Sequence, residues 1–450
     1  MMSFSKKLCG VAGAAALSLL TALPAWAQDA ATAAAPVPDK GDTAWMMIST
    51  VLVLAMILPG LALFYGGLVR TKNMLSVMTQ IGAVACLAML VWVTYGYSLA
   101  FGPDASDGLK PFIASLGKLF LAGITPDSTA ATFTDGVVIP EYVFVCFQMT
   151  FAAITIALVL GSVVERIKFS AVMVFALLWL TIVYFPIAHM VWAAGGLFFE
   201  MGALDFAGGT VVHINAGVSA LVACIILGKR MGYPKEPMPP HSMTLTVVGT
   251  GLLWVGWFGF NAGSALEANG SAALAMINTF VATASAALAW MVAERVAGHK
   301  ASALGFCSGV IAGLVAVTPA AGNSGPFGAI VLGAVASVVC FFAVTVLKPK
   351  LGYDDSLDAF GIHGIGGMVG AIGTGIVYAP SLGGPGGADY AIGGQLVTQI
   401  LATATTIAWA AIGTAIAIFI AKAVTGLRVG PEVEQEGLDL GEHGERAYNY

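Results

Sequence analysis

The sequence predicts an all-α polytopic membrane protein with eleven transmembrane helices. Hydrophobic residues make up 58% of the 450 residues and charged residues only 10%, and the mean hydropathy is +0.89. An ordinary soluble domain carries about 25% charged residues, so this composition excludes that class. The net charge of −5 is small and no basic patch is present, so we do not expect nucleic acid as a partner.

Apolar runs long enough to cross a bilayer recur along the chain. A hydrocarbon core of ~30 Å requires about 20 apolar residues per helix, and eleven runs meet this length. Five precede the polar segment 228–242, and five follow it before a final long helix. Because five is odd, the second set must cross in the opposite orientation, so we expect an inverted 5+5 helix repeat. The predicted spans are 43–68, 74–101, 139–162, 170–197, 206–228, 244–264, 270–293, 302–320, 325–347, 360–379 and 393–424.

The N-terminus and the loop charges predict how the chain is oriented. Lys6 and Lys7, a short apolar core and the cleavage sequence Ala25-Trp-Ala27 indicate a signal peptide over 1–27. Eleven crossings from a periplasmic N-terminus leave the C-terminus in the cytoplasm. The predicted inner loops and end hold fourteen Lys and Arg residues against three on the mature outer side, as the positive-inside rule requires. We therefore expect a multi-pass protein of a bacterial inner membrane.

The mature chain divides into a transmembrane domain and a tail. The transmembrane domain covers 28–424, with repeats near 43–228 and 244–379 followed by helix 11. The tail over 425–450 is polar and acidic. Its paired turn sequences favour an ordered docking surface, and the alternative is a tail that is simply solvated.

Two histidines lie inside predicted spans, in related surroundings. His213 follows Asp205 and Phe206, and His363 follows Asp358 and Phe360, with small residues next to each histidine. Ionisable groups in spans are costly and usually functional, although a lone histidine is often a satisfied structural residue. Inverted repeats would bring both rings to one depth, where each offers a donor and an acceptor to a small polar solute. Axial ligation of haem is the alternative chemistry, but the sequence has no CxxCH motif.

Three acidic residues near predicted helix ends have structural interpretations. Asp358 is expected to be an N-cap that accepts hydrogen bonds from free backbone N–H groups. For Asp205, a cap and a cation-attracting role at a pore mouth remain equally open. Glu165, in the short inner loop 165–168, is expected to form a surface ion pair of little energetic weight.

Aromatic side chains gather at the predicted outer ends of several spans. Such residues are most often packing or interface residues. Here they recur with a hydroxyl in the same repeats that carry the histidines, and ring faces attract cations. Phenylalanines below them would form a hydrophobic constriction that excludes hydrated ions. The residues concerned are Phe147, Phe151, His189, Trp192, Trp257, Phe260 and Ser264.

Several motifs together resemble the Amt/MEP/Rh superfamily of ammonium transporters, in particular its bacterial branch. The resemblance extends over essentially the whole mature chain and in the same order. The motifs are Phe64-Tyr-Gly-Gly-Leu, Pro186-Ile-Ala-His-Met-Val-Trp192, Gly202-Ala-Leu-Asp-Phe-Ala-Gly-Gly-Thr-Val-Val-His213, Trp257-Phe-Gly-Phe-Asn-Ala-Gly-Ser264, Val317-Thr-Pro319, Phe360-Gly-Ile-His-Gly364, Glu436-Gly-Leu-Asp and His443-Gly-Glu.

The resemblance implies a homotrimer in which every subunit has its own pore, and it implies roles for eight residues. By position, these are Phe147, Trp192 and Ser264 in an outer recruitment site for ammonium, Phe151 and Phe260 in a gate, His213 and His363 in the pore, and Asp205 in support of the recruitment site.

The expected function is therefore transport of ammonium or ammonia, and of methylammonium, by a protein that is not an enzyme and needs no cofactor. The resemblance further implies that the inner loops and the tail bind a cytoplasmic PII signalling protein. The alternatives are an ammonium sensor coupled to PII, which would be expected to carry an output domain, and a Rh-like gas channel, which the bacterial-type tail and the recruitment-site aromatics disfavour. A membrane haem protein is less favoured still.

Overall fold

The computed structural model describes residues 36–449, so the predicted signal peptide over 1–27 lies outside the described residues. Within that range, eleven helical segments are long and apolar enough to cross a membrane. This confirms the predicted fold class, and we number the segments as spans 1 to 11 in chain order. They are Lys40–Leu68, Thr71–Phe101, Glu141–Leu160, Phe169–Glu200, Gly209–Leu227, Met243–Gly263, Gly270–Val296, Ala303–Ala320, Pro326–Leu351, Phe360–Val377 and Ile392–Thr425.

Several spans change helical pitch along their length. Spans 1, 2, 4, 5, 9 and 10 each contain a wider, π-helical turn, and span 8 ends in a tighter 3₁₀ turn. The helices are α2 (Lys40–Ala55), α3 (Ala62–Leu68), α4 (Met74–Val91), α5 (Tyr97–Phe101), α6 (Glu141–Leu160), α7 (Phe169–Trp179), α8 (Phe185–Trp192), α9 (Leu197–Glu200), α10 (Asn215–Leu227), α11 (Met243–Gly263), α12 (Gly270–Val296), α13 (Ala303–Val317), α14 (Pro326–Phe342), α15 (Lys348–Leu351), α16 (Ile365–Val377), α17 (Ile392–Thr425), α18 (Pro431–Glu436) and α19 (Leu438–His443).

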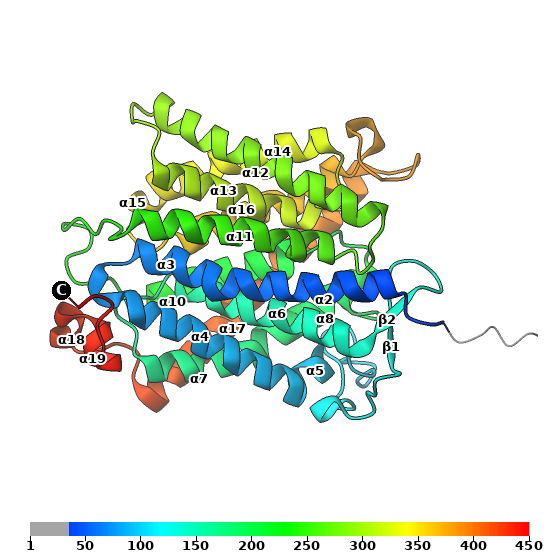
Figure 1. Cartoon of the computed structure of the whole chain (residues 1–450), viewed down its shortest axis with the longest axis horizontal. Helices are drawn as coiled ribbons and strands as arrows, with labels where there is room; N and C mark the ends of the chain where they lie inside the picture. Colours follow the sequence, from blue (N-terminus) through cyan, green and yellow to red (C-terminus); the bar gives the residue numbers. More distant parts are fainter. Residues whose placement is uncertain (1–35, 450) are drawn as a thin grey trace, which may run out of the picture.

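The spans form one bundle with two different ends (Figure 1). At one end lies the antiparallel hairpin of β1 (Thr129–Ala131) and β2 (Val138–Pro140), and we call this the hairpin end. The helices α18 and α19 lie at the other end, which we call the tail end. The first and the last described residues are at opposite ends, as an odd number of crossings requires.

The two repeats are inverted relative to each other, as the sequence predicts. Span 5 starts at the hairpin end, and its counterpart in the second repeat, span 10, starts at the tail end. Both begin with a π-helical turn that carries the histidine, η6 (Gly209–Ile214) and η9 (Phe360–Gly364). These two turns contact each other inside the bundle.

The segment 102–138 contains more structure than its turn-rich sequence predicts. Its chain forms a short helical turn over Leu119–Leu121 and the β1–β2 hairpin. Near it, Glu141 accepts a hydrogen bond from Tyr97 at 2.7 Å and pairs with Lys118. The segment is therefore ordered and anchored to spans 2 and 3 at the hairpin end.

The prediction of a surface ion pair at Glu165 is wrong, because this carboxylate is buried at the tail end. It is 1% exposed and bonds Arg70 at 3.0 Å and Arg230 at 2.7 Å. Arg230 continues to Asp354 at 2.8 Å. The network joins the loops that follow spans 1, 3, 5 and 9, so it holds the two repeats together at this end. These contacts join residues that are 65 to 124 positions apart in the chain, which explains why the local sequence did not reveal them.

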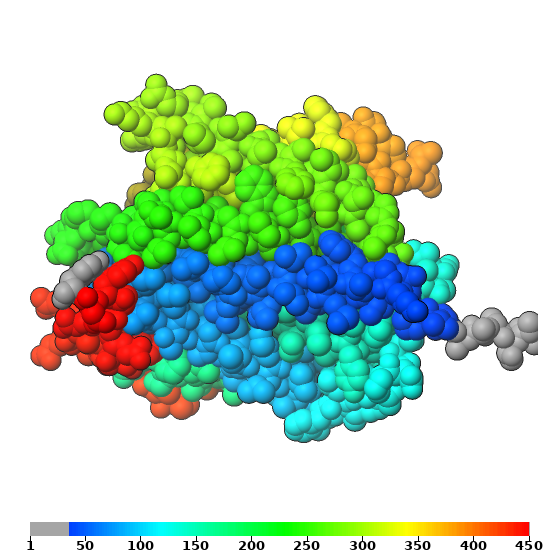
Figure 2. All heavy atoms as spheres, viewed as in Figure 1, coloured from blue at the N-terminus to red at the C-terminus, as the bar shows by residue number. Residues whose placement is uncertain are grey.

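The tail is ordered and docks onto the ends of two spans (Figure 2). Asp439 accepts hydrogen bonds from the backbone N–H groups of Leu75 and Ser76, at 3.1 and 2.8 Å. Glu442 accepts one from the Phe169 N–H at 2.8 Å. Because the first N–H groups of a helix have no partner within it, the tail caps spans 2 and 4.

Replacing Glu165 with glutamine should destabilise the tail end. Burial alone would raise the pKa of Glu165, but Arg230 and Arg70 outweigh it and hold this pKa at about 2. The stability that the charged form contributes is present above about pH 4.5, the ordinary pKa, and is lost as the pH falls towards 2. Breaking a buried pair costs about 3–5 kcal/mol, so thermal unfolding at pH 7 should shift down by several degrees. Asp107→Asn, at an exposed carboxylate, is the control, and an equal Tm for both variants would contradict the prediction.

Candidate functional site

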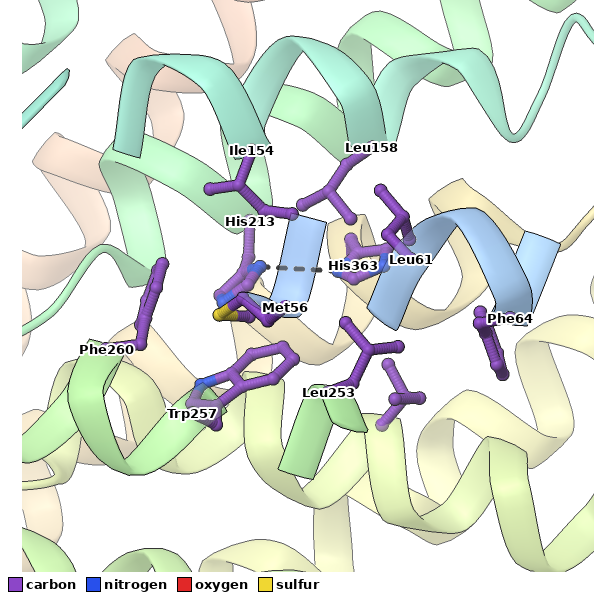
Figure 3. A pocket seen from close by; sticks show the side chains of 11 residues that line it. Met56, Leu61, Phe64, Ile154, Leu158, His213, Leu253, Trp257, Phe260 and His363 are labelled. Atoms are coloured by element: carbon purple, nitrogen blue, oxygen red, sulfur yellow. Dashed lines mark hydrogen bonds between the residues drawn. The ribbon is translucent and has the colours of Figure 1, made fainter. Parts of the chain in front are cut away.

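The two span histidines meet near the middle of the bundle. Their Nδ1 atoms lie 3.3 Å apart, and the rings are nearly parallel, with centroids 5.3 Å apart and planes at 21° (Figure 3). Both side chains are buried. Two Nδ1 atoms can share only one proton in such a contact, so one ring donates and the other accepts. The Nε2 atom of His213 is buried and has no hydrogen-bond partner among residues 36–449.

Two buried carboxylates fix the starts of the histidine-bearing turns. Asp205 accepts hydrogen bonds from the N–H groups of residues 208–211, including Gly208 and Thr210, each at 3.0 Å. In the second repeat, Asp355 accepts from the N–H groups of Ala359 and Phe360, at 3.1 and 2.7 Å. Each carboxylate stands eight residues before its histidine.

The prediction that Asp358 caps the second histidine helix is therefore wrong. Its own backbone is left-handed, with φ 60°, and its carboxylate pairs with Lys348 at 2.6 Å. Asp355 occupies the capping position instead. Counting back 150 residues from His363 and Asp355 gives His213 and Asp205, and this constant spacing would have identified the correct residue.

The capping carboxyls are held away from water. Burial raises the pKa of Asp205, and the hydrogen bonds from Thr210 and the neighbouring backbone N–H groups act in the opposite direction. Burial also raises the pKa of Asp355, to about 6, against the opposing charge of Lys348. Each carboxyl accepts hydrogen bonds at a helix start, where the backbone N–H groups favour a negative charge.

A close crossing of two glycines brings the histidine helices together. A Cβ atom added to Gly217 would collide with the backbone of Gly364 and with the carbonyl carbon of His363, the latter at 2.9 Å. A Cβ on Gly367 would lie 3.1 Å from the His213 Cβ. Small residues thus allow the two backbones to approach closely, as is common between membrane helices.

A narrow apolar cavity runs past the histidine pair. The volume of the cavity is about 10 Å³, which is room for a single small solute. Phe260 and Phe64 lie on opposite sides of the pair in Figure 3. The imidazoles and the Trp257 indole contribute the only nitrogen atoms among the lining side chains. The lining residues are Met56, Leu61, Phe64, Ile154, Leu158, His213, Leu253, Trp257, Phe260, Ile311 and His363.

Two stacked phenyl rings close the cavity towards the hairpin end. Phe151 and Phe260 lie face to face, with centroids 4.2 Å apart and planes at 20°. Phe260 is next to His213, with ring centroids 6.1 Å apart. Both rings are buried. The stacked pair therefore borders the cavity on the side that faces the hairpin end.

The three predicted recruitment residues lie on the side of these two rings that faces the hairpin end. Phe147 and Trp192 each contact Phe151, with centroids 4.9 and 5.7 Å apart. The Trp192 indole N–H donates to the backbone oxygen of Asp205 at 3.0 Å, which fixes the indole and links it to the cap. The Ser264 hydroxyl donates to the Phe260 carbonyl at 2.8 Å, so its lone pairs remain able to accept.

His189, which the sequence grouped with these aromatics, does not belong to the site. Its ring nitrogens lie 2.8 and 2.7 Å from the backbone oxygens of Ala100 and Lys110. It therefore anchors the segment 102–138 to span 4. Trp257 has a more central place than predicted, because its indole stacks on His213 with centroids 5.4 Å apart and planes at 22°. Its spacing of three residues to Phe260 and seven to Ser264 indicated the face of the helix but not this stacking.

The comparisons with known proteins agree on one family. The model of the Ammonium Transporter Family matches residues 44–448. An ammonium transporter of Aquifex aeolicus (strain VF5) is 49% identical over 412 residues, which are 91% of this chain and 94% of that protein. The crystal structure of Saccharomyces cerevisiae Mep2 has 36% identity and a TM-score of 0.79, with 88% of each chain covered. A structure described as a Sensor Amt Protein has 27% identity and a TM-score of 0.81, covering 90% of this chain and 98% of that one.

The fold and the cavity define a polytopic helical membrane protein with a narrow, two-histidine cavity in its bundle. The chain belongs to the ammonium transporter family. Membership supports transport of ammonium as its activity and points to a transporter rather than an enzyme.

Replacing Gly217 with alanine should separate the two histidines. The added methyl group would meet the Gly364 backbone, which cannot move without shifting η9, and overpacking of this kind costs about 1–3 kcal/mol. Purified Gly217→Ala should therefore show a lower Tm. Gly251→Ala is the matched control, because a Cβ there meets nothing within 4 Å. Equal destabilisation by both substitutions would show that the glycine crossing is not the cause.

Proposed function

We propose that each subunit conducts ammonia derived from ammonium, or methylamine from methylammonium, through the cavity at His213 and His363. The observation that carries this proposal is the placement of two hydrogen-bonded imidazoles in a cavity that is otherwise lined by apolar side chains. Such a path gives a small neutral base hydrogen-bonding partners at its centre. It gives a charged ion too few groups to replace its hydration shell.

Loss of a proton before passage is the step that explains selectivity. An ion moved into an apolar medium faces a cost of tens of kcal/mol by Born solvation, and titratable groups avoid it by becoming neutral. Ammonium can release a proton and continue as ammonia. Potassium has no proton to release, so the same cavity excludes it. The proton either stays on the side of entry or crosses by a separate relay through the imidazoles.

The entry site is the group Phe147, Trp192 and Ser264. The aromatic faces attract a cation, and the Ser264 hydroxyl accepts a hydrogen bond from it. Phe151 and Phe260 then act as the gate, and Asp205 supports Trp192 by holding the chain to which the indole donates. In this proposal the hairpin end faces the periplasm and the tail end faces the cytoplasm of a bacterial inner membrane.

Substitution of both histidines should change transport selectively. In proteoliposomes with an inward ammonium gradient, the wild type should give uptake and no potassium current. His213→Leu with His363→Leu removes both imidazoles from the cavity, so methylammonium uptake should fall by more than tenfold, equivalent to ~1.4 kcal/mol or more. His189→Leu, outside the cavity, is the control for loss of a buried histidine. Unchanged uptake by the double variant would refute the pore assignment.

The tail end is the proposed regulatory surface of a homotrimer. The tail is held in place by three acidic side chains. Asp439 and Glu442 cap the starts of spans 2 and 4, and Glu434 accepts a hydrogen bond from the Met231 N–H at 2.7 Å. The inner loop 228–242 and the docked tail would together present one ordered surface to a trimeric PII protein. The likeness to a structure described as a Sensor Amt Protein keeps a sensing function as the second candidate, in which the tail transmits the state of the pore.

Detaching the tail should weaken PII binding without abolishing transport. Asp439→Ala removes the cap from Leu75 and Ser76, a change worth about 0.5–2 kcal/mol. We expect reduced retention of PII by the immobilised protein in a pull-down, with methylammonium uptake preserved. Glu432→Ala, at an exposed position of the same tail, should leave docking of the tail intact. Undiminished PII retention by the Asp439 variant would exclude this part of the proposal.

A further inference from the structure

A buried hydrogen-bond network lies directly behind the His213 ring. The Trp257 indole, which stacks on that ring, donates from Nε1 to the Thr318 hydroxyl at 3.0 Å. Thr318 is fully buried and Trp257 is 2% exposed. Thr318 belongs to the motif Val317-Thr-Pro319, which none of the roles described above explains.

The network continues into two neighbouring spans. The Thr318 hydroxyl lies 2.8 Å from the Leu314 carbonyl oxygen and 3.3 Å from Asn261 Oδ1. The Asn261 amide nitrogen donates to the Thr279 hydroxyl at 2.9 Å. Asn261 stands four residues after Trp257 on α11, so both face span 8. The Thr318 hydroxyl therefore accepts a hydrogen bond from the indole N–H and donates its own hydrogen to a second acceptor. These two bonds fix the orientation of the hydroxyl group.

The same motif also locates the start of the His213 helix. The Pro319 carbonyl accepts a hydrogen bond from the Phe206 N–H at 3.2 Å. A Cβ added to Gly209, the first residue of η6, would lie 2.5 Å from the Pro319 ring. Two consecutive residues of span 8 thus hold the indole and the histidine turn from one point of the fold.

We propose that Thr318 is a positioning residue for the pore. It acts through Trp257 on His213, and it keeps the indole N–H turned away from the cavity, so that among the lining residues only the histidines offer ring nitrogens to the solute. This inference rests on the proposed conduction past His213 and His363. Turning the indole N–H away would favour conduction, because an additional donor beside the two histidines would bind ammonia and slow its release.

Removing the hydroxyl should release the indole. Valine has the shape of threonine, so Thr318→Val leaves the packing of span 8 in place but gives the Trp257 N–H no partner in a dry environment. A buried N–H without a partner is costly. The indole would then be free to turn towards the histidine rings, which are the other polar side chains of the cavity lining.

Three variants test this by transport. Thr318→Val should lower the methylammonium uptake rate about tenfold, the factor that corresponds to ~1.4 kcal/mol, and Thr318→Ser should restore it because serine keeps the hydroxyl. Thr374→Val is the matched control, since Thr374 is equally buried but bonds only the Gly370 carbonyl of its own helix. Equal rates for wild type and Thr318→Val, or equal losses in Thr318→Val and Thr374→Val, would overturn the proposal.

A second measurement reports the indole directly. In protein labelled with ¹⁵N-tryptophan, the signal that disappears in Trp257→Phe identifies the Trp257 indole N–H. Thr318→Val should shift that signal and speed its exchange with deuterium, whereas Thr318→Ser and Thr374→Val should leave it unchanged. An unmoved, protected signal in Thr318→Val would refute the role of Thr318 even if the wild type transports. A wild type that fails to transport while the signal responds as expected would instead refute the proposed function.

Discussion

The site depends on how the chain satisfies backbone N–H groups where two helices begin inside the protein. The first N–H groups of a helix have no partner within it, and water is scarce at these positions. Asp205 and Asp355 supply the acceptors at corresponding points of the two repeats. Each then fixes a π-helical turn whose histidine faces the centre. The carboxylates that cap the starts of these two helices therefore also determine the positions of the imidazoles.

The inverted repeat converts these two local arrangements into one cavity. Spans 5 and 10 enter from opposite ends and cross where Gly217 meets Gly364. The rings consequently meet at 3.3 Å between Nδ1 atoms, a distance that larger residues at the crossing would not allow. The narrowness of the cavity follows from this approach, so its size limit and its polar centre have a common structural origin.

Sequence patterns predicted the parts of this structure that depend on one segment at a time. Apolar run lengths predicted all eleven spans, and the repeated motif predicted that His213 and His363 would meet. The errors concern residues whose partners are distant in sequence. Glu165 bonds to residues 95 positions before it and 65 after it. Thr318 receives a bond from a residue 61 positions earlier. At the start of the second histidine helix, the local pattern favoured Asp358 as the cap, whereas the cap is Asp355, three residues earlier.

The two ends of the bundle differ although the repeats that build them are related. At the hairpin end, rings stack above the histidines and Trp192 is tied to the Asp205 backbone. At the tail end, Arg230 pairs with Glu165 and with Asp354, the residue next to the Asp355 cap. The tail residue Glu434 bonds Met231, the residue next to Arg230. Arg230 pairs with Asp354, and the adjacent Asp355 caps the turn that carries His363. These contacts connect the docked tail to that turn. The hairpin end of the cavity is therefore bordered by aromatic rings and the tail end of the bundle by buried ion pairs, so the two ends differ in chemistry.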